Sequence, residues 1–348
     1  MKINMDNNYL LCAIKAAKIH KEITKDLKEN NIIQPGKSLL EITYYIENQI
    51  KNKTNYNPLK PLECGMAFPC SMSVNEIIAH YTPAYKNQDY IIQKDDIIKV
   101  DFGVHEQGTI IDSALTFHFN DKYDEFIKIS KDITNYGVSL CGPDAVLGDI
   151  GQNIEEYIQS KEIEIDGKIY NLKTIGDLSG HNIGKYVIHN SKAVPNIAIK
   201  YPVRMEVGEF FAVEPFITTG SGKISYNEPT YLFMLNKEKT RKIHDINGQL
   251  QELNELNKLN TDELYLYTNL KNQYSTLCFC TRWIENDFKE NYAIIRTYKK
   301  NLESLVQKKF ILSFPTIYDQ KDELSSQFEH TIYIKENGII NLTKNEYY

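Results

Sequence analysis

Paired cysteines are lacking in this sequence. Six cysteines are present, but they form no CxxC pair and no histidine-flanked zinc spacing. The two that lie nearest to each other, Cys278 and Cys280, belong to an apolar run that is typical of a protein core. We therefore interpret all six as reduced thiols of an intracellular protein.

Long apolar runs and an excess of positive charge are lacking too. The apolar stretch at 9–14 is too short for a signal peptide. No segment reaches the length of about 20 residues that a transmembrane helix needs. The net charge of −6 gives no overall basic footprint for nucleic acid. We expect a cytoplasmic, monomeric protein that binds no membrane and no specific nucleic acid.

The segment 96–119 predicts a β-hairpin, because Ile, Val, Phe and Thr dominate on both sides of a polar turn. If Glu106 and Gln107 form the two-residue loop, Asp101 and Asp112 are direct partners across the ladder. Their Cβ atoms would then lie on one face, about 4.5–5.5 Å apart.

Two carboxylates at that distance repel each other and destabilise a bare sheet. The rest of the hairpin is apolar enough to be central in the fold, so a positive partner is expected between them. A divalent cation is the simplest candidate, because carboxylate oxygens suit Mn, Mg and similar ions. Two exposed aspartates on an edge hairpin are the alternative that this motif alone leaves open.

An internal repeat relates two halves of the chain. A helical segment that begins at Leu39 is matched by one that begins at Leu147, at an offset of 108 residues. The strand that ends at Asp101 is matched by one that ends at Glu214, at an offset of 113 residues. The repeat predicts two related helix–strand halves that place Asp101 and Glu214 at equivalent points.

Residues 225–310 break this pattern, because they are polar and mostly helical in periodicity. We interpret them as a helical insertion subdomain within a single α+β domain, 1–348. Within it, leucines every three residues drift off a helix face, so 245–260 is predicted to be a loop. Strands at 326–334 and 338–342 close the chain.

Strand-like segments contribute five residues that combine four carboxylates with one imidazole: Asp101, Asp112, His181, Glu214 and Glu329. An oxygen-rich set of this kind can hold two divalent ions, which in two-metal sites lie about 3.5–4 Å apart. A single zinc site needs only about three protein ligands. Any chain of this size contains as many such residues, so the local sequence contexts decide the question.

Those contexts resemble methionine aminopeptidase, type II, of the pita-bread fold, over about residues 8–348. The motifs that carry the resemblance are AFP at 67–69, AHYTP at 79–83, VDFG at 100–103, ID at 111–112, SGHNIG at 179–184, AVEPF at 212–216 and FEHT at 328–331. The resemblance implies the pita-bread fold with a pseudo-two-fold repeat. It also implies an enzyme that removes the N-terminal methionine from nascent proteins, preferentially before a small second residue.

The resemblance further implies roles for the site residues. Asp101, Asp112, His181, Glu214 and Glu329 would hold two divalent ions (Mn, Co, Fe or Zn), with Asp112 and Glu329 bridging. Glu214 would also move the proton. His80 and His189 would contact the substrate and take part in catalysis. The methionine slot would be formed by Phe68, Ile188, His189 and Cys278.

A helical insertion between the last two ligands distinguishes type II, and TLCFCTRW at 276–283 matches it, whereas 236–260 does not. An X-prolyl dipeptidase would use the same five ligands, but it would lack the insertion and usually carries an additional N-terminal domain. A non-catalytic pita-bread protein that binds RNA or ribosomes is the second alternative. Such relatives lose metal ligands, whereas this chain has all five. Binding of the active enzyme to the ribosome stays open.

Overall fold

The computed structural model describes residues 2–86, 89–240 and 256–348. None of the helices described there is long and apolar enough to cross a membrane. The helices are α1 (Lys2–Glu29), α2 (Leu39–Thr54), η2 (Asp121–Tyr123), α3 (Asp124–Ser139), α4 (Leu147–Gln159), α5 (Lys237–Thr240), α7 (Thr261–Tyr274), α8 (Thr281–Asp287), α9 (Tyr292–Ile295) and α10 (Tyr298–Gln307).

Within the described ranges, the strands form five small sheets. One holds β1 (Cys64–Val74), β3 (Ile97–Glu106) and β4 (Thr109–His118); another holds β8 (Ser179–Ile183), β9 (Ala193–Pro195), β10 (Phe210–Val213), β16 (His330–Lys335) and β17 (Gly338–Asn341). A third holds β7 (Lys173–Thr174), β11 (Phe216–Thr218) and β15 (Ser325–Gln327), and a fourth holds β2 (Ile77–Ala79), β12 (Ser225–Leu235), β13 (Cys278–Cys280) and β14 (Ile311–Tyr318). The last pairs β5 (Glu162–Ile165) with β6 (Lys168–Asn171).

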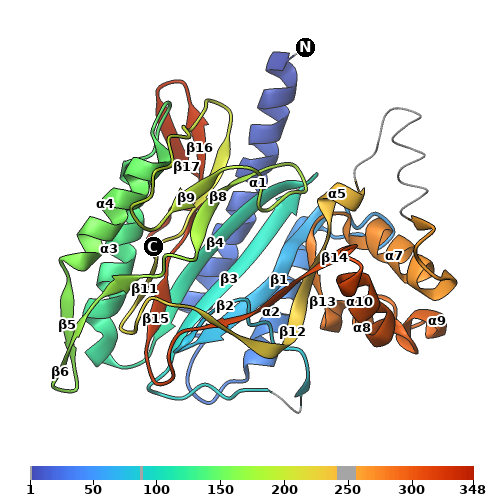
Figure 1. The fold of residues 1–348 in the computed structure, drawn as a ribbon, viewed down its shortest axis with the longest axis horizontal. Helices are drawn as coiled ribbons and strands as arrows, with labels where there is room; N and C mark the ends of the chain where they lie inside the picture. The colour runs from blue at the N-terminus through green and yellow to red at the C-terminus, as the bar shows by residue number, and fades with distance from the viewer. Residues whose placement is uncertain (1, 87–88, 241–255) are drawn as a thin grey trace.

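Helices cover the first two sheets in the same way. Helices α1 and α2 pack on the β1–β3–β4 sheet, and α3 and α4 pack on the sheet that contains β9 and β10. Figure 1 shows α3 and α4 on one side of the strands and α7 to α10 gathered at the opposite side. The α+β pita-bread fold expected from the sequence is confirmed.

The internal repeat is visible in the backbone hydrogen bonds. The amide of Leu39 donates to the carbonyl of Tyr90, and the amide of Leu147 donates to the carbonyl of Val203. These two bonds are related by the same offsets, 108 and 113 residues, that relate the sequence halves. The bridges beside them repeat at these offsets as well: Ser38 with Ile91, and Val146 with Arg204. In each half, the second helix (α2 or α4) therefore begins beside an equivalent β-bridge.

The predicted register of the β3–β4 hairpin is wrong by two residues. Asp101 lies opposite Ala114, and Asp112 lies opposite Gly103. The two-residue loop is Gln107–Gly108, with φ of 51° and 79°, because a tight hairpin turn of this type needs positive φ at both central residues and glycine supplies one at no steric cost. A Cβ on Gly108 would also come within 2.3 Å of the Tyr186 ring.

Because the register error is an even number of residues, both aspartates still point to the same face. They are diagonal neighbours rather than direct partners, and such residues are about 7–8 Å apart, with their Cβ atoms somewhat closer. The position opposite Asp112 is Gly103, where a Cβ would lie 2.2 Å from Cε1 of Phe68. The missing side chain thus leaves room for the Phe68 ring beside the aspartates.

Residues 225–310 are not helical throughout. The first eleven form the strand β12, which pairs with β13 and β14, and helices begin only at Lys237. A separate hydrophobic cluster, made of buried residues between Phe233 and Ile311, packs inside this segment. Most of the loop predicted at 245–260 lies outside the described residues.

Candidate metal and substrate site

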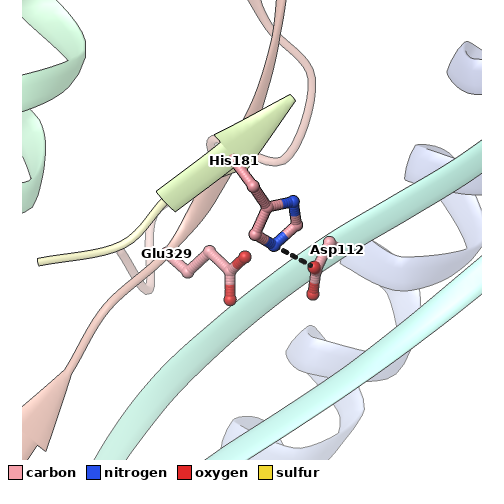
Figure 2. Close-up of side chains that lie close together, drawn as sticks. All are labelled: Asp112, His181 and Glu329. Atoms are coloured by element: carbon pink, nitrogen blue, oxygen red, sulfur yellow. Dashed lines mark ion pairs between the residues drawn. The ribbon is translucent and has the colours of Figure 1, made fainter. Parts of the chain in front are cut away.

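Three of the predicted ligands meet where separate elements approach one another. Asp112 projects from β4, His181 from β8, and Glu329 from the turn between β15 and β16. Each offers one ligand atom, and these three atoms lie within 4.8 Å of one another. Figure 2 shows the three side chains pointing into a common space, with His181 Nε2 3.6 Å from Asp112 Oδ2.

The remaining two predicted ligands extend this group. Glu214 directly follows β10, and its Oε1 lies 3.2 Å from Nε2 of His181. In the β8–β10 ladder His181 pairs with Ala212, so the strand pairing itself brings these two functional side chains together. Asp101, on β3, lines the same cavity as Asp112 and Glu214, although it is not part of the 4.8 Å group.

Side-chain hydrogen bonds attach the Glu329 segment to the hairpin. The hydroxyl of Ser113 donates to the carbonyl of Glu329 at 2.6 Å. The amide of Asp112 donates to the Thr331 hydroxyl at 2.9 Å, and that hydroxyl donates to the Asp112 carbonyl at 2.5 Å. Two residues more than 200 positions apart in the chain are thereby fixed side by side.

One residue in this site was missed by the sequence analysis. Gln327 is buried, and its Nε2 donates to Oε2 of Glu214 at 3.1 Å and lies 3.4 Å from Oε2 of Glu329. It stands two residues before Glu329, and side chains two apart on an extended strand point to the same face. This spacing in the sequence could have indicated that the Gln327 amide lies beside the carboxylate of Glu329.

Burial raises the pKa of all four carboxyls. For Asp101, the negative charges of Asp112 and Glu214 add to the effect of burial, and for Glu329 the largest added contribution comes from Asp112. Burial likewise raises the pKa of Asp112, and it raises that of Glu214 to about 8. Burial is the largest cause of all four shifts, because an ionised carboxylate that is removed from water loses its hydration unless a positive charge replaces it.

The donor set fits divalent cations. Oδ1 of Asp101 and Oε1 of Glu329 are buried and have no hydrogen-bond partner among the residues that the structure describes. Burial lowers the pKa of His181 to about 4, so its imidazole is neutral and keeps a lone pair for a metal. Carboxylates and neutral imidazole suit Mn, Fe, Co or Zn.

A cavity of about 470 Å³ is lined by four of the five predicted ligands, Asp101, Asp112, His181 and Glu214. All five predicted substrate residues line it: Phe68, His80, Ile188, His189 and Cys278. The ring of His189 lies against that of His181, with centroids 3.9 Å apart. The same cavity is therefore lined both by apolar side chains and by histidines and carboxylates.

His80 has an unusual backbone at this cavity. It directly follows β2, and its φ of 66° falls in the left-handed region that few residues other than glycine adopt. Burial lowers the pKa of its imidazole to about 4, so the ring is neutral. Its Nδ1 is buried without a hydrogen-bond partner in the described part of the chain. Strain and an unpaired polar atom are typical of a functional residue.

Solved structures share this fold. A thermophilic Arx1 superposes with a TM-score of 0.74 at 16% identity, covering 97% of this chain and 91% of the other. The methionine aminopeptidase of Thermotoga maritima superposes with a TM-score of 0.59 at 19% identity, covering 95% of each chain. At these identities the likeness concerns the fold.

Sequence comparison gives the class, since residues 12–246 match the family model described as metallopeptidase family M24. Methionine aminopeptidase 2-1 of Fusarium vanettenii is 35% identical over 95% of this chain and 70% of its own length. Methionine aminopeptidase 2 of Komagataella phaffii is 37% identical over 93% of this chain and 67% of its own length. The chain belongs to metallopeptidase family M24, among its type II methionine aminopeptidases, and is a metal-dependent hydrolase.

Proposed function

We propose that the protein removes the N-terminal methionine from nascent polypeptides in the cytoplasm, acting as a monomer and preferring a small second residue. One observation carries the proposal: three carboxyls and a neutral imidazole line the same cavity as an apolar slot and two further histidines, and the buried Glu329 carboxyl lies next to Asp112 and His181. Relatives named methionine aminopeptidase 2 support it. Binding at the ribosome is compatible with this substrate and forms no part of the proposal.

The proposed ligands are Asp101, Asp112, His181, Glu214 and Glu329, which would hold two divalent ions with Asp112 and Glu329 shared between them. Bound ions of this kind acidify a water molecule towards neutral pH and polarise the carbonyl that it attacks. The partnerless oxygens of Asp101 and Glu329 support this assignment. Gln327 would hold Glu214 and Glu329 in orientation through its amide.

Glu214 is the proposed proton carrier. Its carboxylate lies at the cavity wall, held by Gln327 on one oxygen and 3.2 Å from His181 on the other. From there it takes the proton of the attacking water and later delivers it to the leaving amine.

His80 and His189 are the proposed donors to the carbonyl oxygen of the substrate. Both rings line the cavity, and burial keeps both neutral by lowering their pKa values. A neutral imidazole still has one N–H to donate. Donation to the oxygen as negative charge develops there stabilises the transition state more than the ground state.

The methionine side chain would fill the slot between Phe68, Ile188, His189 and Cys278, where apolar contacts with the thioether and its methylenes favour binding. Phe68 and Cys278 come from β1 and β13, so the slot joins the pita-bread sheet to residues 225–310. We propose that this segment is an insertion subdomain within the single catalytic domain 1–348. Its own hydrophobic cluster supports that division.

A pair of peptides tests the proposal against its alternatives. We expect the protein with Mn or Co to release methionine from Met-Ala-Ser and to leave an Ala-Pro peptide intact. Hydrolysis of the Ala-Pro peptide instead would indicate an X-prolyl dipeptidase. Absence of hydrolysis of both peptides, with metal bound, would indicate a non-catalytic protein.

A further inference from the structure

Arg282, in the first turn of α8, is a buried charge that the proposed mechanism does not use. Only 2% of the residue is exposed. Its guanidinium binds Glu47 through two nitrogens, Nη1 to Oε2 at 2.5 Å and Nη2 to Oε1 at 2.8 Å. Glu47 belongs to α2 and is 4% exposed. The pair therefore joins the helical segment to the main body through the protein interior.

The same guanidinium also reaches the segment that follows His80. Nε donates to the carbonyl of Pro83 at 2.9 Å, and Nη2 lies 3.4 Å from the Thr82 hydroxyl. A single arginine fork thus contacts both Glu47 and the backbone three residues beyond His80. An arginine is suited to this because its five donors lie in one rigid plane, whereas a lysine offers a point charge.

The chain around His80 is held from both sides. Before it, β2 pairs with β14, and after it the Met72 amide donates to the Tyr81 carbonyl at 2.7 Å. The Arg282 contacts lie one and two residues further on. A left-handed backbone at a residue other than glycine persists only when its surroundings fix it in place. Among these contacts, those made by Arg282 come from the helix α8, whereas the others come from strands.

Stability alone is a weak reason for this pair. Removing two charges from water is costly, and replacing a buried ion pair by apolar residues of similar volume is often neutral or stabilising. A more specific role follows from the contacts of Arg282. Two of its donors are directed at Thr82 and Pro83. It can fix the direction in which His80 enters the cavity.

We propose that the Arg282–Glu47 pair is a positioning device for His80: Glu47 fixes the guanidinium, and the guanidinium fixes residues 82 and 83 so that the His80 ring points into the cavity. Arg282 does not touch the substrate. The kinetic part of this inference rests on the proposed function.

The test uses a variant in which neither charge is left alone. Arg282→Met alone would strand Glu47 in the interior and could unfold the protein, whereas Glu47→Met together with Arg282→Met leaves no unpaired charge. For this double variant we expect a kcat on Met-Ala-Ser reduced by about 10²-fold, the size of effect that small misplacements cause. KM and bound metal should change little.

Combination with His80→Ala separates positioning from general structural damage. If the pair acts through His80, adding it to His80→Ala should lower kcat no further, because contacts that act as one unit are not additive. Independent damage would multiply the two losses.

A matched control is the ion pair between Glu263 and Lys308, in which Glu263 is also buried and both residues lie inside the helical segment. Glu263→Met with Lys308→Met removes this ion pair, together with the Glu263 hydrogen bonds to Asn260 and Ser304, from the same segment and away from the cavity. We expect its kcat to equal that of the wild type. A loss as large as that in the Arg282 variant would assign the effect to loosening of the segment and would overturn the proposal.

A second readout is independent of peptide hydrolysis. Diethyl pyrocarbonate modifies accessible histidines, and peptide mapping reports its rate at each site. In the Glu47→Met/Arg282→Met variant we expect modification of His80 to be several-fold faster than in the wild type, with the partly exposed His118 unchanged as the internal reference. Unchanged modification of His80 would contradict the positioning role even if the protein released no methionine. Failure of the wild type on Met-Ala-Ser would contradict the proposed function alone.

Discussion

Gln327 donates a hydrogen bond to Glu214 across 113 positions of the chain, at 3.1 Å. The donor stands on β15 and the acceptor directly follows β10. The same amide nitrogen lies 3.4 Å from Glu329. One neutral side chain thereby orients two of the buried carboxyls that are proposed to hold metal, without adding charge to them.

Gln327→Leu should lower metal affinity or kcat/KM by about 10–100-fold, as expected when a group that orients metal ligands is lost. The change replaces the amide by an apolar group and leaves Glu214 without its donor. Gln273→Leu is the control, because Gln273 donates to the Tyr56 hydroxyl at 3.1 Å on the helical segment, away from the cavity. Unchanged metal affinity and activity in Gln327→Leu would remove Gln327 from the site.

Asp112→Asn should abolish most of the metal binding while leaving the metal-free fold intact or steadier. In metal-free protein Asp112 faces other buried carboxyls, and removing a charge relieves their repulsion. The measurement is thermal unfolding in chelator, next to metal content by elemental analysis. Asp166→Asn, at an exposed carboxylate paired with Lys122, serves as the control. A large loss of metal-free stability in Asp112→Asn would contradict the clustered geometry.

His80→Ala should leave metal content unchanged and reduce kcat by about 10²–10³-fold, the usual effect of losing one donor to a developing oxyanion. His80 is not one of the five proposed ligands, so the two readouts should separate. Steady-state kinetics on Met-Ala-Ser and metal analysis of the same preparation give both. Normal turnover would remove His80 from the mechanism, and loss of metal would make it a ligand.

Gly108→Ala should destabilise the fold by about 1–3 kcal/mol more than Gly36→Ala, because it adds a clash to the same backbone penalty. The two glycines have φ of 79° and 86°. A Cβ at Gly108 would meet the Tyr186 ring at 2.3 Å, whereas at Gly36 nothing lies within 4 Å. Urea unfolding of both variants checks this. Equal losses of stability in the two variants would indicate that the Tyr186 ring moves aside and that only the backbone conformation is penalised.

The sequence predicted the structure correctly where the prediction depended on a regular spacing of residues. Strand alternation placed Asp101 and Asp112 on one face, and the repeat offsets anticipated the equivalent pairings at Leu39 and Leu147. The exact partner of Asp101 was wrong because the loop position depends on which turn residues adopt positive φ. Gln107 does so beside Gly108, and the pattern of apolar residues does not encode that choice.

Contacts between distant segments were beyond sequence reasoning. Gln327 and Arg282 act through partners 113 and 235 positions away. The spacing of Gln327 from Glu329 indicates a shared face, but no local motif places Glu214 beside Gln327 or Glu47 beside Arg282. The strand β12 was also missed inside a segment interpreted as helical. Pairing of β12 with β14 joins the two ends of that segment. These tertiary contacts, rather than the polar composition of the segment, decide that residues 225–235 form a strand.

The most direct test of the account is metal-dependent release of methionine. Protein treated with chelator and dialysed should release no methionine from Met-Ala-Ser, and addition of Mn, Co or Fe should restore turnover. Titration of the metal with simultaneous measurement of bound ions would show whether activity follows the first or the second equivalent. Full activity in metal-free protein would contradict the account.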